Sequence, residues 1–388
     1  MIPYGKQDIS NEDIESVLET LKSEFITQGP KVEKFEEKIC NKVGCKFAVT
    51  ANSATSCLHL ACQALELKKN DWVWTSPNSF VASANAALYS GAKIDFVDIN
   101  PSTYNICVTK LEEKLRIAKK NNLLPKIIIP VHFAGQSCEM EKIFQLSQKY
   151  NFKIIEDASH AIGGKYKGER IGNCKYSSIT VFSFHPVKII TTAEGGVATT
   201  NCKIIAEKMK MDRSHGIRRL EKDQINEIKD EIWNYKQERL GFNYRLNDLQ
   251  SSLGLSQLKR LDSFLKRRHK IAKNYYKSLA DLGIQLPYQD PNTFSSFHLF
   301  PIRVSQNKGG VSQKKMYNFL RENKILVNLH YIPIYRQPYF REMGFKEGYC
   351  NEAESYFKEV ISLPIYSTLN QDEQNFIVEK IKICLNKK

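Results

Sequence analysis

The chain has 388 residues, of which 42% are hydrophobic and 26% are charged. This length allows two or three domains, and the composition is that of a globular protein, which excludes wholesale disorder. The opening segment has neither a basic stretch nor an apolar core, so we expect no secretory signal peptide. No apolar run approaches the roughly 20 residues that a membrane helix needs. These features predict a soluble cytoplasmic protein with no membrane partner.

The charge balance is strongly basic. Fifty-seven Lys and Arg residues against 42 Asp and Glu residues give a formal net charge of +15. Such a charge is compatible with nucleic acid, a membrane surface or a small anionic substrate. The basic residues, however, are scattered in ones and twos, and the sequence has no nucleic-acid recognition motif. The charge alone therefore selects no partner.

Ten cysteines are spread along the chain without forming a CxxC motif. No Cys/His cluster has the spacing of zinc ligands, so we expect no metal site. The plain interpretation is a set of reduced, mostly buried thiols in a reducing compartment.

Short apolar segments alternate with helical patterns from the N-terminus to about residue 200. An amphipathic helix is predicted over 11–23. Strands are predicted over 46–51, 71–76, 93–99, 126–133, 153–158, 178–184 and 195–200. Helices are predicted between them over 53–65, 79–91 and 139–151. Because these strands are apolar throughout, they predict a parallel or mixed sheet that helices cover on both faces, which is an α/β architecture.

The pattern changes at about residue 245, where one long helical stretch runs to 283. Shorter strands and helices follow over 295–304, 313–323 and 372–385. This shift predicts a large domain over residues 1–255 and a small C-terminal α+β domain over 256–388.

The common phosphate-binding and hydrolase motifs are absent from the sequence. There is no GxGxxG after a strand, no GxxxxGK[ST], no HExxH and no GxSxG. Dinucleotide, nucleoside triphosphate, zinc-protease and serine-hydrolase chemistry are therefore disfavoured.

Two loops at predicted strand ends carry polar groups of the kind that bind ligands, which collect at the carboxyl ends of parallel strands. The small residues of 52–56 open a helix, where free N–H groups hold a phosphate or form an ordinary cap. Asp157 ends a buried strand and needs a partner there, either a heteroaromatic N–H⁺ or the next helix N-terminus.

Two further strand ends supply an amine and an aromatic ring. Lys188 follows an apolar strand, where desolvation would lower its pKa and leave an amine able to form a Schiff base; the alternative is an ordinary surface lysine. Phe80 follows another strand and is either a core residue or a platform for a cofactor ring. Pyridoxal 5′-phosphate requires four such groups: a site for its phosphate, a carboxylate for its ring nitrogen, an amine for its aldehyde and an aromatic ring that stacks on it.

The order of several sequence blocks resembles that of the DegT/StrS nucleotide-sugar aminotransferases. The blocks are NSAT, SPNSFVA, EDASHA, SFHPVK, ITTAEGG, NYRLNDLQSSLGLSQL and HYIPIY. This family is a branch of the fold type I pyridoxal-phosphate enzymes, and the resemblance covers essentially the whole chain. It implies a large domain with a mixed, mostly parallel sheet and a small C-terminal α+β domain.

The resemblance also implies roles for individual residues. Lys188 and Asp157 would be catalytic: Lys188 would bind the cofactor covalently and move a proton, and Asp157 would pair with the ring nitrogen. His160 stands where many relatives have Gln, near the cofactor's phenolic oxygen. The implied cofactor contacts are Lys188, Asp157, His160, Ala54, Thr55, Ser183, Phe80 and, from the neighbouring subunit of a homodimer with shared sites, Asn243. The implied substrate contacts are Tyr4, Glu24, Phe25, Ile26, Thr27, His330, Tyr331, Ile332 and Pro333.

The implied reaction moves an amino group from L-glutamate to C4 of a UDP-linked 4-keto-6-deoxy-N-acetyl sugar. The product would be UDP-4-amino-4,6-dideoxy-N-acetyl-β-L-altrosamine, for pseudaminic acid biosynthesis. Related dehydratases replace the lysine with histidine, so Lys188 favours aminotransfer. The alternatives are another sugar-nucleotide aminotransferase, of the perosamine or dTDP-linked type, and a non-catalytic regulator. Arg245 is an anion-binding candidate by charge, or a helix-surface residue.

Overall fold

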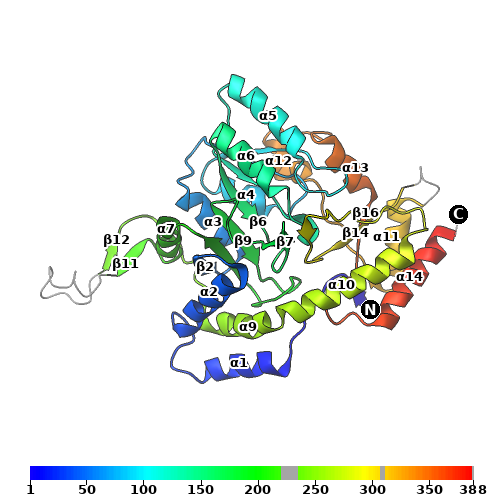
Figure 1. The fold of residues 1–388 in the computed structure, drawn as a ribbon, viewed down its shortest axis with the longest axis horizontal. Coiled ribbons are helices and arrows are strands. Elements are labelled where there is room, and N and C mark those ends of the chain that lie inside the picture. The colour runs from blue at the N-terminus through cyan, green and yellow to red at the C-terminus, as the bar shows by residue number, and fades with distance from the viewer. Residues whose placement is uncertain (220–234, 306–310, 387–388) are drawn as a thin grey trace, which may run out of the picture.

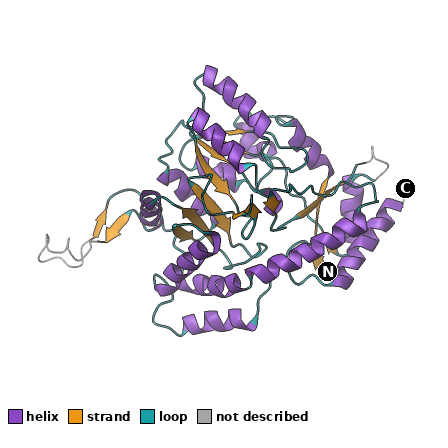
Figure 2. Ribbon diagram, in the orientation of Figure 1, coloured by secondary structure: helices purple, strands orange, loops and turns teal. Residues whose placement is uncertain are grey.

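The computed structural model describes residues 1–219, 235–305 and 311–386. Its centre is a seven-stranded sheet with the strand order β2-β10-β9-β6-β5-β3-β4 (Figures 1 and 2). The strands are β2 (Phe47–Ala51), β3 (Trp72–Thr75), β4 (Lys93–Phe96), β5 (Ile127–Ile129), β6 (Lys153–Asp157), β9 (Ile179–Ser183) and β10 (Gly196–Thr200). All seven predicted strands are therefore present. Five are one or two residues shorter than predicted, whereas β4 and β5 are much shorter than the predicted 93–99 and 126–133.

The sheet is mixed and mostly parallel, as predicted. Neighbouring strands from β4 through β3, β5 and β6 to β9 pair in parallel. Strand β10 is antiparallel to both of its neighbours, β9 and β2. One edge of the sheet consequently contains the beginning of β10 and the carboxyl ends of β2, β3, β5, β6 and β9. This edge is where the predicted ligand-binding loops are expected to meet.

Helices cover both faces of the sheet, which explains why its strands are apolar throughout. Consecutive strand residues face opposite ways, so Ile127 packs in one core cluster and Ile128 in another. The first cluster is built around α3 (Ala54–Ala64) and includes α4 (Ala82–Leu88) and α7 (Lys203–Arg213). The second includes α5 (Val108–Lys120) and α6 (Met140–Tyr150).

A third cluster joins the sheet to the helices at the bottom of Figure 1. The cluster contains residues of α2 (Pro30–Val43) and α9 (Asp248–Lys259), and α1 (Asn11–Leu21) packs on α9 outside it. Their ends carry recognisable sequence signals. A capping box between Ser10 and Asp13 begins α1, Pro30 begins α2, and Gly44 ends α2 with a φ of 81° that favours glycine.

The long helical stretch predicted over 245–283 is two helices, which corrects that prediction. Helix α9 ends at Lys259, Arg260 caps it, and α10 (Leu261–Leu279) follows directly. The backbone N–H of Arg260 donates to Gln257, three residues back, which tightens the last turn. Its guanidinium reaches across to the carboxylates of Asp8 and Asp13. The hydrophobic pattern continues through this turn, so periodicity alone gives no sign of the break.

A fourth core cluster contains α10 and most of the C-terminal elements. Its strands β14 (Phe300–Arg303) and β16 (Val360–Leu363) pair antiparallel. The N-terminal strand β1 (Ile2–Pro3) pairs with β15 (Ile325–Leu326), which brings Ile2 into this cluster. The helices of this part of the chain are α11 (Gln313–Glu322), α12 (Pro338–Glu342), α13 (Asn351–Glu359) and α14 (Gln371–Asn386). The domain boundary between residues 255 and 256 stays a prediction.

The remaining elements are short. Strands β13 (Thr293–Phe294), β7 (Lys165–Tyr166) and β8 (Glu169–Arg170) form a small sheet. The antiparallel pair of β11 (Ile217–Arg219) and β12 (Tyr235–Gln237) projects from the body beside α7 (Figure 1). Turns of 3₁₀ helix occur at Phe133–Gly135 and Ile334–Arg336. Within the described ranges, no helix combines the length and apolar character needed to span a membrane.

Candidate active site

A cavity of about 560 Å³ lies at the shared edge of the sheet. The loops after β2, β3, β6 and β9 line it, together with Tyr4 and the segment 328–332. Eleven of the predicted site residues line this cavity: Lys188, Asp157, His160, Ala54, Thr55, Ser183, Phe80, Tyr4, His330, Tyr331 and Ile332. The parallel topology thus brings together residues that are up to 328 positions apart in the sequence, from Tyr4 to Ile332.

Lys188 lies in the turn that follows β9, where its backbone N–H donates to the carbonyl oxygen of His185 (2.8 Å). Burial lowers the pKa of its amine to about 8, against a smaller opposing effect of the Asp157 charge. A tenth of a group with this pKa is neutral at pH 7, far more than for a solvated lysine. Lys188 is therefore suited to act as a nucleophile and as a proton carrier.

Asp157 is the last residue of β6 and is buried. Its Oδ2 accepts a hydrogen bond from Ser83 Oγ (2.6 Å), and its Oδ1 accepts from Ser159 Oγ (2.6 Å) and Ser159 N (3.1 Å). These donors hold the carboxylate in one orientation at the cavity wall and compensate for its burial. An oriented carboxylate of this kind is suited to pair with a cationic ring nitrogen.

The N-terminus of α3 faces the cavity on the side of β10. Ser53 Oγ caps the helix by accepting from Ser56 N (3.0 Å), which leaves the N–H groups of Ala54 and Thr55 at the cavity wall. Gly196 allows β10 to approach closely, because a Cβ there would lie 2.5 Å from Ala54 N. Free N–H groups at a helix N-terminus form a good anion site, and Ser183 adds a hydroxyl to the same cavity.

Phe80 is 61% exposed although it is a large apolar side chain, and it lines the cavity. The core interpretation of this residue is therefore wrong. A ring at the mouth of a cavity is available to pack against a flat ligand.

Two rings on another wall are hydrogen-bonded to each other. Tyr331 Oη lies 3.2 Å from His160 Nε2, and the backbone N–H of Ala134 donates to His160 Nδ1 (3.3 Å). Burial, followed by the charges of Lys188 and His330, holds the pKa of His160 well below its usual value. Both rings therefore present neutral hydrogen-bonding groups.

His330 and Tyr4 form the neighbouring part of the wall, with ring centroids 5.1 Å apart. His330 Nδ1 is 2.9 Å from Ser362 Oγ. Burial and the charge of Lys188 lower the pKa of His330 to about 3, and burial raises the pKa of Tyr4. This wall is thus uncharged at neutral pH.

The other predicted site residues lie outside the cavity of their own chain. Residues 24–27 form an exposed turn held by Ile26 O, which accepts from Asp248 N. Asn243 is exposed on the segment between β12 and α9, and Arg245 is half-buried nearby. Pro333 is buried beside the lining residue Ile332.

Several residues of the site carry no recognisable sequence signal. Ser83 reaches Asp157 from α4, and Asn328 and Gln337 line the cavity from the C-terminal half of the chain. His298 packs on His160 with ring centroids 4.4 Å apart. Only Ser159, two residues after Asp157, has a signal, because that spacing is typical of an Asx turn.

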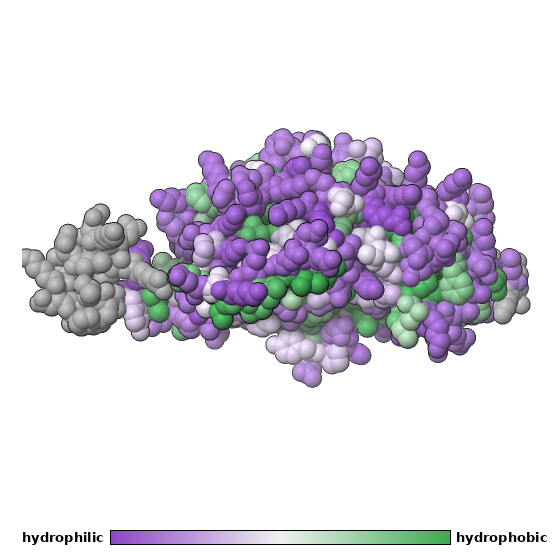
Figure 3. Space-filling model, turned by 90° about the horizontal axis from the view of Figure 1, so that it is seen from below, coloured by the Kyte–Doolittle hydropathy of each residue, from purple (hydrophilic) through white to green (hydrophobic). Residues whose placement is uncertain are grey.

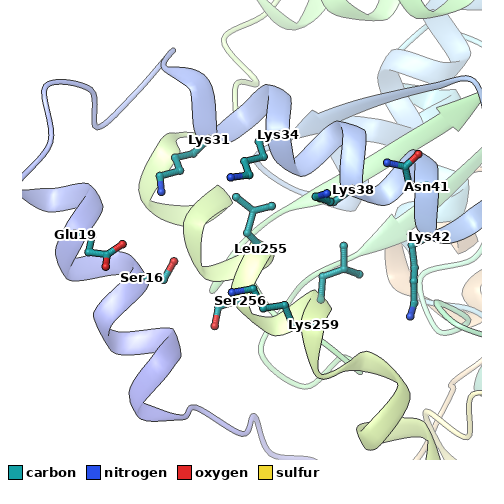
Figure 4. Close-up of a pocket in the computed structure, with 11 residues that line it drawn as sticks. Ser16, Glu19, Lys31, Lys34, Lys38, Asn41, Lys42, Leu255, Ser256 and Lys259 are labelled. Carbon is teal, nitrogen blue, oxygen red and sulfur yellow. The ribbon is translucent and has the colours of Figure 1, made fainter.

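A second cavity, of about 470 Å³, lies between α1, α2 and α9 and has a different chemistry (Figure 4). Its floor includes Leu255 and Leu258, and it is surrounded by five lysines: Lys31, Lys34, Lys38, Lys42 and Lys259. Lys42 pairs with Asp262 at 2.8 Å. We call this feature the lysine groove.

An apolar stripe crosses the lower face of the molecule, which Figure 3 views from below. Helix α1 and the turn after it expose five large apolar side chains: Ile14, Leu18, Leu21, Phe25 and Ile26. Contiguous apolar surface of this kind is typical of an interface.

The mixed α/β sheet, with an activated lysine and an oriented carboxylate at its carboxyl edge, defines an aminotransferase of fold type I. Comparison with known proteins makes the assignment more specific, because the sequence pattern of the DegT/DnrJ/EryC1/StrS aminotransferase family matches residues 7–382. The chain belongs to this family.

Individual relatives match the chain over its full length. It is 38% identical to the UDP-4-amino-4,6-dideoxy-N-acetyl-β-L-altrosamine transaminase of Campylobacter jejuni (strain 81-176), covering 100% of this chain and 98% of that protein. The structure of Helicobacter pylori PseC, an aminotransferase of pseudaminic acid biosynthesis, superposes with a TM-score of 0.90 at 32% identity and covers 100% of both chains. The PLP form of the putative sugar aminotransferase Spr1654 of Streptococcus pneumoniae gives a TM-score of 0.88 at 28% identity, covering 100% of this chain and 99% of that one.

Proposed function

We propose that the protein is a pyridoxal-phosphate-dependent aminotransferase that moves an amino group from L-glutamate to C4 of a UDP-linked 4-keto-6-deoxy-N-acetyl sugar. The product would be UDP-4-amino-4,6-dideoxy-N-acetyl-β-L-altrosamine, an intermediate for pseudaminic acid. The observation that carries the proposal is the buried Lys188 amine, which shares one cavity with Asp157 and the N-terminus of α3.

The residues of the cavity fit pyridoxal 5′-phosphate. Ala54, Thr55 and Ser183 would hold the phosphate, and the close approach of Gly196 keeps the α3 N-terminus open to it. Phe80 would pack against the ring. When bound, the cofactor supplies an aldehyde that accepts amino groups and a ring that withdraws electrons from the reacting carbon.

Two residues would perform the chemistry that belongs to the chain itself. Lys188 would hold the cofactor covalently and then carry a proton to and from the reacting carbon, for which a pKa near 8 is well suited. Asp157 would keep the ring nitrogen protonated, while Ser83 and Ser159 prevent its carboxylate from turning away.

The sugar nucleotide would bind along the uncharged wall of Tyr4, His330, Tyr331 and Ile332, with Pro333 behind it. Neutral donors and acceptors on this wall suit a sugar that carries hydroxyl, keto and N-acetyl groups. The 38% identical Campylobacter relative, named for this sugar, supports the substrate over the alternatives.

We further propose a homodimer with shared active sites. Residues 24–27 and Asn243 are exposed and lie outside their own cavity, so they are free to complete the cavity of a partner. The exposed apolar side chains of α1 and the following turn suit such an interface. We propose cytoplasmic activity because all ten cysteines are free thiols, as in proteins of reducing compartments.

The test begins with the colour of the purified, cofactor-loaded protein. It should absorb visible light, the band should disappear when L-glutamate is added, and 2-oxoglutarate should be released. A panel of UDP-, GDP- and dTDP-linked 4-keto sugars then decides the substrate from the amino sugar formed. Equal use of all three nucleotides would refute the UDP assignment and support a broader sugar-nucleotide aminotransferase. A colourless protein without turnover that binds DNA would support the regulator.

A further inference from the structure

His160 is held as one defined tautomer. The backbone N–H of Ala134 donates to its Nδ1 (3.3 Å), and only an unprotonated ring nitrogen can accept that bond. A neutral imidazole with an unprotonated Nδ1 carries its hydrogen on Nε2. Ala134 has a φ of 58°, a left-handed conformation that is unfavourable for alanine. The chain thus adopts an unfavourable backbone conformation at the residue that fixes this tautomer.

The surroundings of His160 keep the ring neutral. Its titratable and charged neighbours are Lys188, His298, His330, Tyr331 and, next to Tyr331, Tyr4 and Asp157. Burial and the Lys188 charge lower the pKa of His160 well below its usual value, and burial does the same for His298. The two buried rings therefore pack together without a positive charge.

The hydrogen of His160 Nε2 is directed at Tyr331. Tyr331 Oη lies 3.2 Å from Nε2, so this oxygen accepts and its own hydrogen must point elsewhere. Within the described residues, the structure records no other hydrogen-bond partner for this hydroxyl. Because both side chains line the cavity, the free direction of the Tyr331 O–H is toward the ligand.

We propose that Tyr331 donates a hydrogen bond to the ring oxygen of the bound cofactor next to its aldehyde carbon, and that His160 acts only as a positioning residue that orients this hydroxyl. The proposal rests on the proposed function, since it requires the cofactor at Lys188. That oxygen adjoins the carbon captured by Lys188, and the side chains of Lys188, His160 and Tyr331 line the same cavity.

The proposal changes the expected role of His160. Its single N–H is used by Tyr331, so it has none left for the cofactor. A glutamine at position 160 would keep the arrangement, since its oxygen accepts from Ala134 and its amide donates to Tyr331. A hydrogen bond donated to the anionic ring oxygen would draw negative charge away from that oxygen. The oxygen would then attract less strongly the proton on the nitrogen that joins Lys188 to the cofactor, so the pKa of this nitrogen would be lower.

The test is a pH titration of the visible absorption band in cofactor-loaded protein without sugar. Tyr331→Phe should move the midpoint upward by about one pH unit, since the nitrogen then holds its proton more tightly. His160→Leu should shift it in the same direction by less, because the hydroxyl remains but is no longer oriented. His160→Gln should titrate like the wild type. The double variant His160→Leu/Tyr331→Phe should match Tyr331→Phe alone.

Tyr275→Phe is the matched control, because it removes a buried hydroxyl that donates to Pro364 O outside the cavity; its midpoint should not move. A shift in His160→Leu with none in Tyr331→Phe would mean that His160 contacts the cofactor directly and would overturn the proposal. An unchanged midpoint in Tyr331→Phe with a raised KM for the sugar would also overturn it. If His160→Leu does not fold, Tyr331→Phe decides alone. A wild-type protein without a Lys188-dependent band would overturn the proposed function and this inference together.

Discussion

The two cavities of the molecule use lysine in opposite ways. The active-site cavity, of about 560 Å³, contains Lys188, whose amine is buried at the end of a sheet strand. The lysine groove, of about 470 Å³, is surrounded by five lysines, and Lys34, Lys38 and Lys259 among them are exposed (Figure 4). Desolvation makes the first amine reactive, and contact with water keeps the others solvated cations. The amount of positive charge therefore does not indicate where the chemistry occurs.

The comparison also shows where part of the net charge of +15 lies. Helix α2 places Lys31, Lys34, Lys38 and Lys42 at helical spacing along one face, above apolar side chains that their stems cover. Lys188, in contrast, is fixed by a strand, a turn and a buried carboxylate. Four experiments test how far this difference holds.

The largest expected effect is that of Lys188→Ala on turnover. Amination of the keto sugar should fall by roughly ten-thousandfold or more, because covalent binding and proton transfer are both lost. Steady-state formation of the amino sugar measures this. Lys34→Ala and Lys38→Ala in the groove should keep wild-type kcat, and a comparable loss in either would refute the distinction between the two cavities.

Asp157→Asn should lower kcat on the order of a hundredfold to a thousandfold, since a neutral amide cannot keep the ring nitrogen protonated in a buried site. Asp262→Asn, which removes the partner of Lys42 in the groove, is the matched control and should leave kcat unchanged. Both variants are assayed at saturating sugar and glutamate. Near-normal kcat in Asp157→Asn would remove Asp157 from the catalytic assignment.

Lys188→Met should stabilise the cofactor-free protein near pH 7. The folded-state pKa of about 8 lies below that of an unfolded lysine, so charged Lys188 disfavours folding below pH 8. The gain, at most about 3 kcal/mol, should decline between pH 8 and 10.5 as the unfolded chain also loses its proton. Denaturant unfolding at several pH values measures it. Lys34→Met should show no such pH-dependent gain, and a pH-independent Lys188→Met effect would contradict the burial argument.

The smallest expected effect concerns the ion pair between Lys42 and Asp262. Asp262 is 69% exposed, so the pair should contribute less than about 1 kcal/mol to the free energy of unfolding. Lys42→Met should show this in denaturant unfolding, and added salt should reduce the difference. A larger, salt-independent loss would mean that the groove lysines are structural.

The strands and the main site residues were predictable because their signals are local. A strand buried on both faces must be apolar throughout, so all seven strands of the sheet could be located from composition. Lys188, Asp157 and Ala54 stand at strand ends that parallel topology brings to one edge. The division between α9 and α10 was not predictable, because it depends on a turn at Arg260 that leaves the hydrophobic pattern intact.

The rest of the site depends on contacts between segments that are distant in the sequence. Ser83 reaches Asp157 from α4, and His298 packs on His160, but neither has a neighbour in the sequence that points to the site. Residues 24–27 were expected at the substrate and Asn243 at the cofactor of the neighbouring subunit, and all of them lie at the surface of their own chain. The contact of Asn243 with a partner's cavity stays a prediction, and that of residues 24–27 is a proposal, since both require a second chain.

The sequence by itself determined the α/β sheet, the lysine at one strand end and the carboxylate at another, because the burial of a strand is visible in its local residue pattern. Only the tertiary structure decided how these groups behave. The amine of Lys188 becomes reactive because distant segments exclude water from it. His160 carries its hydrogen on Nε2 because Ala134, from a different loop, donates to the other nitrogen. Desolvation and hydrogen-bond geometry are properties of atoms brought together in space, and no local pattern specifies them.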